Sequence, residues 1–289
     1  MPDALISAHS TLRPLFDALP ESIKSMARSL YRRLLDWRYG QLGLAEAQQN
    51  DRIWKLHPSV ALRGQEQEVE TARWFRTVIR PGMDVMDIGA NVGQMTLEMA
   101  YLVGQKGRVI AVEPGPGNLD LLEKHVEGNG FSDRVIVVAA ACSDQTDQTV
   151  KLKIFGDDSN VVGSGFSILD VPQTRSQELL PEIFIQVQTT TIDALCSTYA
   201  FRPAIIKIDV EGAELLTLMG AKATLATIRP IIHFGFHPFA FSDPEAASQR
   251  ILSLLVEHNY IIESRDGQTV TSSLDMEEYV ARPQENREK

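Results

Sequence analysis

Two acidic residues border apolar runs of the sequence at places where a small ligand could bind. Asp87 opens the segment 87–93, which reads D-I-G-A-N-V-G, and Glu113 closes the apolar run 109–112. In nucleotide-binding α/β proteins, a carboxylate at the end of the second strand accepts hydrogen bonds from ribose hydroxyls. An acid in the preceding turn suits a ligand with an ammonium or sulfonium group. Either acid alone could instead cap a helix or end a strand in solvent, but together they predict S-adenosylmethionine as the ligand.

The glycines of this segment predict a tight turn between a strand and a helix. Gly89 and Gly93 permit a sharp turn and a close approach of the backbone to a ligand. Asn91 occupies the position of the second glycine of a dinucleotide-binding loop, the one that admits the pyrophosphate. A pyrophosphate ligand is therefore disfavoured, and a nicotinamide-dependent oxidoreductase is kept as the alternative function.

Small residues close the third apolar run, 135–141, and Cys142, Ser143 and Asp144 follow it. Small side chains at this strand end leave room for a flat base, because adjacent strand ends line the same cleft. We expect Ser143 or Asp144 to bind the exocyclic amine of adenine. The alternative is a plain turn that Asp144 caps.

The fourth run leads into an acid-rich segment, K-I-D-V-E-G-A-E, at residues 207–214. We expect Asp209 and Glu211 to flank the reactive methyl group, with Asp209 also touching the cofactor. Both could instead cap the next helix, which is the role expected of Glu214. Because the segment has neither histidine-rich spacing nor a calcium-loop pattern, no metal site is predicted.

A histidine follows the fifth apolar run. Methyl transfer to a hydroxyl requires alignment of the acceptor and removal of its proton, and imidazole suits that task because its pKa lies near neutrality. His237, just after residues 231–236, is the leading candidate for the base. Asp209 is the alternative base, or the group that orients His237. His233, earlier in the same run, is expected to be a core histidine.

Short apolar runs alternate with helical stretches from residue 80 onward. Strands that are apolar on both faces and alternate with helices are typical of a parallel sheet covered on both sides. The expected fold class is therefore α/β, a doubly wound, Rossmann-like sheet. The expected strands are 85–88, 109–113, 135–141, 204–209, 231–237, 260–263 and 269–272, and the expected helices are 94–103, 118–129, 213–226 and 244–258.

The alternation breaks between residues 149 and 191. Residues 150–155 and 183–188 alternate in polarity like half-exposed strands, and a Gly- and Ser-rich stretch that includes 163–167 lies between them. This pattern predicts an antiparallel insertion whose loop closes over the acceptor. A disordered surface loop is the alternative.

Charge is distributed unevenly along the 289 residues. The chain has 28 Lys and Arg against 38 Asp and Glu, a net charge of −10, which argues against nucleic acid as a partner. Residues 1–40 carry +2, so the remainder carries −12. Within 21–40, apolar residues recur at helical spacing with basic residues between them, which predicts an amphipathic helix. Such a helix packs on its own domain, pairs with a second copy in a homodimer, or attaches weakly to an anionic membrane.

The cysteines and the apolar runs of the sequence indicate the compartment and the relation to membranes. Cys142 and Cys196 are far apart and have no C-x-x-C spacing, so no disulfide framework or zinc site is expected. The chain shows neither a secretion signal nor an apolar run long enough to cross a bilayer. A cytoplasmic protein, at most peripheral at a membrane, is expected.

Four segments together resemble the FkbM family of S-adenosylmethionine-dependent methyltransferases. They are residues 81–96, which contain D-I-G-A-N-V-G, V-E-P at 112–114, T-T-I-D-A-L at 190–195, and I-K-I-D-V-E-G-A-E at 206–214. The resemblance covers about residues 65–265. It implies a class I methyltransferase fold with seven strands and an antiparallel last strand, and it carries Thr96 over as a cofactor-binding residue. It also implies methylation of a hydroxyl on a sugar, a glycan or glycolipid, or a natural product.

The expected organisation is a helical extension at 1–60, a methyltransferase domain at 61–281 and a tail at 282–289. The acceptor is expected to be a small molecule or a hydroxyl linked to a glycan or lipid. One departure from the family concerns the motif E-x-H, in which Gly235 stands where relatives often have the glutamate before His237. A non-catalytic protein that keeps the cofactor fold is therefore a further alternative.

Overall fold

A twisted seven-stranded sheet forms the centre of the protein. The computed structural model describes residue 23 and residues 43–61, 68–155 and 182–284. The strand order in the sheet is β11-β12-β10-β9-β3-β4-β5. The strands are β3 (Asp84–Ile88), β4 (Arg108–Val112), β5 (Val135–Val138), β9 (Pro203–Ile208), β10 (Ile231–Gly235), β11 (Tyr260–Ser264) and β12 (Glu278–Pro283). All neighbours pair in parallel except β12, which is antiparallel to both β10 and β11, so the expected doubly wound α/β sheet is confirmed.

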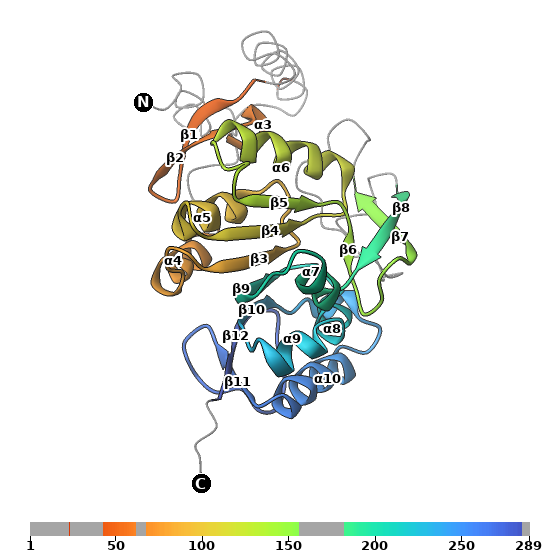
Figure 1. Ribbon diagram of the computed structural model, residues 1–289. Coiled ribbons are helices and arrows are strands. Elements are labelled where there is room, and N and C mark those ends of the chain that lie inside the picture. Colours follow the sequence, from red (N-terminus) through yellow and green to blue (C-terminus); the bar gives the residue numbers. More distant parts are fainter. Residues whose placement is uncertain (1–22, 24–42, 62–67, 156–181, 285–289) are drawn as a thin grey trace.

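Helices cover both faces of the sheet (Figure 1). They are α3 (Pro58–Ala61), α4 (Val69–Val78), α5 (Gln94–Val103), α6 (Pro116–Gly128), α7 (Ile192–Thr198), α8 (Glu214–Met219), α9 (Lys222–Thr227) and α10 (Pro244–Glu257), with a short 3₁₀ helix at Pro238–Ala240. Alternate residues of each strand enter opposite cores. Val85 packs with α4, α5 and α6, whereas Met86 packs with α7 to α10. Burial on both faces explains why the strands are nearly continuous apolar runs.

Polar residues interrupt this pattern at one level of the sheet. Asp87 on β3 pairs with Lys207 on β9, which in turn pairs with His233 on β10. All three side chains are at least 95% buried, and they lie on the face covered by α4. Because burying charge is costly unless it is paired, this row marks the functional part of the sheet.

The insertion forms a separate small sheet. Strands β7 (Thr149–Phe155) and β8 (Glu182–Thr190) pair antiparallel, as the sequence predicts. The expected third strand divides, because β5 ends at Val138 and Ala141–Cys142 form β6, which pairs with β8. The stretch 163–167 lies outside the described residues.

Near the N-terminus the structure corrects one expectation. Residues 45–56 fall within the segment 1–60 expected to be helical, but they form a hairpin of β1 (Ala45–Gln49) and β2 (Arg52–Leu56). Its alternating buried residues, including Trp54 and Leu56, join the core beside α5 and α6. Apart from Ile23, the amphipathic helix expected over 21–40 lies outside the described residues.

The last strand lies later in the chain than expected. Residues 269–272 contribute only one isolated bridge, between Thr269 and Glu263, and β12 occupies 278–283 instead. An interior strand needs buried side chains, which Tyr279, Val280 and Ala281 supply. The expected tail boundary at 282 is therefore too early.

The helix expected over 213–226 is also interrupted. It divides into α8 and α9 at Gly220, where a β-carbon would come within 2.1 Å of the Ser143 carbonyl oxygen. Among the residues that the structure describes, none of the helices has the length and apolar character needed to span a bilayer.

Candidate active site

The turn after β3 has the shape that its glycines predict. Gly89, Asn91 and Gly93 have φ angles of 82°, 51° and 90°, a region that favours glycine. A β-carbon at Gly89 would lie 2.0 Å from the carbonyl oxygen of Asp209, at the end of the neighbouring strand β9. The absence of a side chain therefore lets the turn pack directly on the segment after β9.

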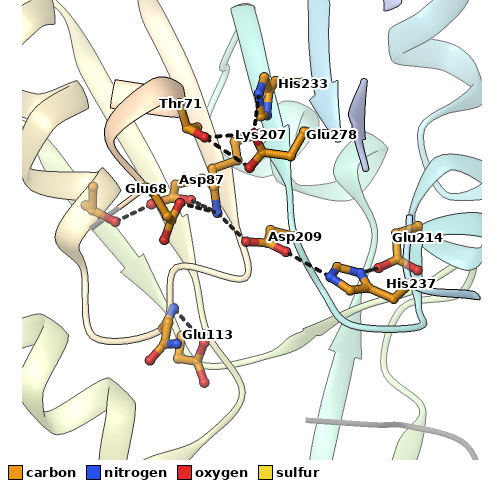
Figure 2. Close-up of polar contacts among 12 residues, drawn as sticks. Glu68, Thr71, Asp87, Glu113, Lys207, Asp209, Glu214, His233, His237 and Glu278 are labelled. Carbon is orange, nitrogen blue, oxygen red and sulfur yellow. Dashed lines mark hydrogen bonds and ion pairs between the residues drawn. The ribbon is translucent and has the colours of Figure 1, made fainter. Parts of the chain in front are cut away.

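Glu113, after β4, fixes this turn from the other side. Its Oε2 accepts the backbone N–H of Asn91 and its Oε1 accepts that of Gly115, both at 2.9 Å. Burial raises the pKa of Glu113 to about 7, even though these N–H donors favour the carboxylate. Glu113 therefore shapes the turn as well as facing the cavity beside it (Figure 2).

Three carboxylates surround one buried lysine (Figure 2). The Nζ of Lys207 lies 3.1 Å from Asp209 Oδ2, 3.8 Å from Asp87 Oδ1 and 3.9 Å from Glu68 Oε2. Burial opposes the charge of Lys207, but the carboxylates outweigh it and raise the pKa of the lysine. Burial likewise raises the pKa values of Asp87 and Glu68, whereas the charge of Lys207 lowers that of Asp209. This cluster has more carboxylates than cations.

The cluster and turn border a cavity of about 790 Å³. Its lining includes Gly89, Asn91, Glu113 and Asp209, which are four of the nine residues predicted from the sequence to bind the cofactor, together with Glu211. Asp87 is fully buried and does not belong to the lining.

Gly93 and Thr96 support the site from behind. Gly93 packs on Leu122, and Thr96 Oγ1 donates a 2.6 Å hydrogen bond to Asp87 Oδ2. The other oxygen, Asp87 Oδ1, is buried without a hydrogen-bond partner among the described residues. Ser143 and Asp144 do not belong to the lining, which at that strand end consists of Ala140, Ala141 and Cys142.

These observations fit a cationic nucleoside cofactor. Glu68 and Asp209 line the cavity beside Lys207, and an ammonium group there would balance the excess of carboxylates over cations in this cluster. Because Gly89 has no side chain, the turn packs against the backbone of Asp209, so both segments border the same cavity. Among the described residues, no group of three His, Cys, Asp or Glu side chains could hold a metal ion.

His237 lies at the far side of Asp209 (Figure 2). Its Nδ1 is 2.7 Å from Glu214 Oε1, and its Nε2 is 3.8 Å from Asp209 Oδ1. Glu214 is fully buried and also accepts the backbone N–H of Gly212 at 3.0 Å. Burial opposes the imidazolium, but Glu214, Asp209 and Glu211 outweigh it and raise the pKa of His237.

The contact with Glu214 fixes the tautomer of this histidine. Because a carboxylate only accepts hydrogen bonds, the neutral imidazole donates from Nδ1, and Nε2 is left free to accept a proton. Glu211, with a φ of 45°, lies beside this pair, and burial raises its pKa. The arrangement is that of a general base with an orienting acid.

His233 is the buried residue that the sequence predicts. Its ring lies against those of Trp74 and Phe75, and burial lowers its pKa to about 4. Its Nε2 is 3.7 Å from Glu278 Oε2, so it is a neutral histidine at a polar edge of the core.

Sequence reasoning missed the roles of Glu68, Lys207 and Glu214. Lys207 precedes Asp209 by two residues, and this period of two signals that both side chains share a face of the strand. Glu214 was assigned only to capping, because nothing in a linear sequence shows that His237 folds back onto it. Glu68 precedes α4 with a φ of 45° and has no local signal.

Comparisons with known proteins identify the family to which the chain is similar. The sequence pattern of the methyltransferase FkbM domain matches residues 87–262, more than half of the chain. A probable cobalt-precorrin-6B C(15)-methyltransferase (decarboxylating) of Sulfurisphaera tokodaii is 29% identical over 76 residues, 26% of this chain and 40% of that protein. Its counterpart in Saccharolobus solfataricus is 22% identical over 104 residues, 36% of this chain and 49% of that protein. The chain thus spans less than half of these curated relatives.

Solved methyltransferase structures are similar at low identity. An FkbM methyltransferase of Methylobacillus flagellatus has a TM-score of 0.43 and 16% identity, covering 78% of this chain and 52% of that one. A putative rRNA-methylase of Clostridium thermocellum has a TM-score of 0.44 and 12% identity, covering 75% and 96%. The strand order has the predicted class I methyltransferase arrangement, with an antiparallel last strand, and the family match favours methyl transfer over the nicotinamide alternative. The chain belongs to the FkbM methyltransferase family, whose cofactor is S-adenosylmethionine.

Proposed function

We propose that the protein transfers a methyl group from S-adenosylmethionine to a hydroxyl group of a sugar, a glycan or glycolipid, or a natural product. The observation that carries this proposal is the pair of His237 and Glu214 beside Asp209, with a distance of 2.7 Å between His237 Nδ1 and Glu214 Oε1. A hydroxyl is a poor nucleophile until its proton is removed, and this pair supplies an oriented base for that proton.

The cofactor site is assigned to residues on both sides of the turn after β3. Asp87 and the cluster around Lys207 would bind the amino-acid part of the cofactor, and Glu113 would accept hydrogen bonds from its ribose. Ala140 and Ala141 leave space for the base. When bound, the cofactor supplies a methyl group already activated by a sulfonium.

The remaining chemistry falls to the side chains around Asp209. Asp209 is held by Lys207 and faces the Nε2 of His237, so it orients the imidazole and favours its protonated form. His237 accepts the hydroxyl proton at Nε2, while Glu214 stabilises the resulting charge through Nδ1. Glu211 adds a further negative charge beside the imidazolium.

The acceptor is either a free small molecule or a hydroxyl linked to a glycan or lipid, and we place the protein in the cytoplasm. The relatives named for C-methylation of a precorrin suggest carbon as the competing acceptor atom. The oriented base favours oxygen, because a hydroxyl has a proton that His237 can remove.

Methyl-labelled cofactor tests this proposal. The protein is incubated with ¹³C-methyl S-adenosylmethionine and a panel of sugars, glycolipids and hydroxylated natural products, and the product is identified by mass and by the carbon shift of the methyl group. An O-methyl product whose rate falls roughly 100-fold in His237→Ala, with unchanged cofactor affinity, supports the proposal. A C-methyl product, or full turnover by His237→Ala, overturns it.

A further inference from the structure

A second cavity adjoins the candidate active site on the side of β10 and β12. It has a volume of about 760 Å³ and shares Asp209 with the cofactor cavity. Its lining also includes His237, Glu278 and Arg265. Any molecule in this cavity therefore lies beside the free Nε2 of the proposed base.

Gly235 lines this cavity, and its lack of a side chain leaves space beside His237 and Asp209. A β-carbon at this position would lie 3.0 Å from His237 Cε1 and 3.5 Å from Asp209 Oδ1. The backbone of Gly235 lies at the end of β10 and has no positive φ angle, so its conformation would accept a side chain. Any such side chain would occupy the space between the base and Asp209.

Glu278 lies directly opposite Gly235 on the neighbouring strand β12. Cross-strand partners point to the same face of a sheet, so the space left by Gly235 lies next to the Glu278 carboxylate. This carboxylate accepts the single proton of the Thr71 hydroxyl at 2.9–3.0 Å. Its side chain keeps 32% exposure, so acceptor sites remain for other donors.

The charges around this cavity select the chemistry of its ligand. Asp209, Glu277 and Glu278 present carboxylates, whereas the two cationic groups are already paired, the guanidinium of Arg265 with Glu70 and the imidazole of His237 with Glu214. A ligand with several hydrogen-bond donors matches these groups. A phosphorylated or carboxylated ligand would place like charges together, which is unfavourable.

We infer that this cavity is the acceptor subsite, in which Glu278 binds a hydroxyl or ammonium group of a neutral or cationic polyhydroxylated ring and Gly235 sets the size of ring admitted beside His237. The inference rests on the proposed function, because it assumes that the ring carries the hydroxyl to be methylated. Beyond that function, it states that anionic acceptors are disfavoured and that Glu278 and Gly235 determine which acceptors bind.

Binding of sugar probes tests the inference without turnover. The protein is saturated with S-adenosylhomocysteine, and dissociation constants for glucosamine, methyl glucoside and glucose 6-phosphate are obtained by saturation-transfer NMR titration. Glucosamine and methyl glucoside, the cationic and the neutral probe, are both expected to bind about tenfold or more tightly than glucose 6-phosphate.

Three variants locate that binding. Glu278→Gln is expected to weaken glucosamine about tenfold and to reduce its advantage over glucose 6-phosphate. Glu263→Gln is the matched control, because Glu263 lies on the adjacent β11, pairs with Arg282 and is outside the cavity; it should bind all three probes as the wild type does. Gly235→Val should lose the rings and retain S-adenosylhomocysteine.

The outcomes separate the subsite from the reaction. Equal affinities for the neutral and phosphorylated rings, no ring binding by the wild type, or identical behaviour of Glu278→Gln and Glu263→Gln overturns the inference. If Gly235→Val fails to fold, the Glu278 comparison still decides. Ring binding that follows the expected pattern without any O-methyl product leaves the subsite standing and overturns the proposed function. If an O-methyl product forms at the wild-type rate in both Glu278→Gln and Gly235→Val, the proposed function stands and the subsite is overturned.

Discussion

A carboxylate fixes the chemistry of His237 in two ways. Glu214 holds Nδ1 at 2.7 Å and so determines which nitrogen is free, and its charge favours the imidazolium that forms when the hydroxyl proton is taken. The helix start at Glu214 and the end of β10 bring the two residues together although they are 23 positions apart. The proposed base therefore depends on a residue that a sequence motif alone would assign to a helix cap.

Replacement of this carboxylate tests its role. Glu214→Gln retains the shape of the side chain but removes the negative charge that raises the pKa of His237. We expect kcat to fall by roughly 100-fold, and the acidic limb of the pH profile to move to lower pH. Titration of the His237 ring by NMR measures the pKa directly. An unchanged limb, or a histidine pKa that rises in the variant, would contradict the assignment.

The raised pKa of Glu113 predicts that cofactor binding releases a proton. Its pKa is raised to about 7 by burial, so at pH 6 most molecules carry a proton there. Ribose hydroxyls that donate to this carboxylate favour its ionised form, and binding should therefore release a proton. Calorimetry in two buffers of different ionisation enthalpy measures the number released.

Two comparisons make this measurement specific to Glu113. At pH 9 the carboxylate is already ionised, so the release should vanish in the wild type. In Glu113→Gln it should be absent at every pH. Proton uptake at pH 6 would show that Glu113 does not contact the ribose.

At the scale of elements, the turn after β3 depends on the contact between two strand ends. Gly82 and Gly89 both have positive φ angles, 88° and 82°, but only Gly89 is packed against backbone. A β-carbon at Gly82 meets nothing within 4 Å, whereas one at Gly89 meets the Asp209 carbonyl at 2.0 Å. Substitution of Gly82 would therefore introduce backbone strain alone, whereas substitution of Gly89 would introduce both backbone strain and a steric clash.

Matched alanine variants use this difference. Gly82→Ala should lower the free energy of unfolding by about 1–2 kcal/mol, the cost of a left-handed conformation. Gly89→Ala adds the steric conflict and should cost about 2–5 kcal/mol, with cofactor affinity at least tenfold weaker. Urea unfolding and calorimetry provide the two measurements. Equal effects of the two variants on affinity would show that the turn does not form the cofactor site.

The elements were predictable from the sequence where local pattern determines them. The runs that form β3, β4 and β9 are apolar on both faces, and the alternation at 150–155 and 183–188 predicted the pair β7 and β8. The hairpin at 45–56 and the strand at 278–283 were missed, since their burial depends on partners distant in the chain. The cavity residues Gly89, Asn91, Glu113 and Asp209 follow strand ends, which is why the sequence pointed to them, whereas Ser143 and Asp144 were expected there and lie outside the lining. Glu214 and Glu278 enter the site only through tertiary packing.

For the whole molecule, the buried carboxylates make stability depend on pH. The folded pKa of Glu113, about 7, lies above the ordinary value of 4.5 for a glutamate side chain. The folded protein therefore binds more protons than the unfolded chain between these values, and the free energy of unfolding falls as the pH rises through this range. Burial raises the pKa values of Glu68 and Asp87 in the same direction.

Denaturant titrations across this pH range test the effect. The cofactor-free protein should be more stable at pH 5.5 than at pH 7.5, with Glu113 contributing at most about 3 kcal/mol. Saturation with S-adenosylhomocysteine should reduce the difference, because the ribose compensates the buried carboxylate, and Glu113→Gln should flatten the curve. A stability that rises from pH 5.5 to 7.5 in the wild type would contradict this account.

The place of β12 has a consequence for the order in which the molecule assembles. Of the strands that the structure describes, β11 pairs only with β12, although it precedes β12 in the chain. Until residues 278–283 pair with β10, β10 is an unprotected edge strand and β11 cannot join the sheet. The cofactor turn belongs to β3 and β4, so it can form before the acceptor wall that contains Glu278. A partly folded chain would thus form its cofactor site before its acceptor subsite. During that interval, the open edge of β10 is the surface most prone to aggregation.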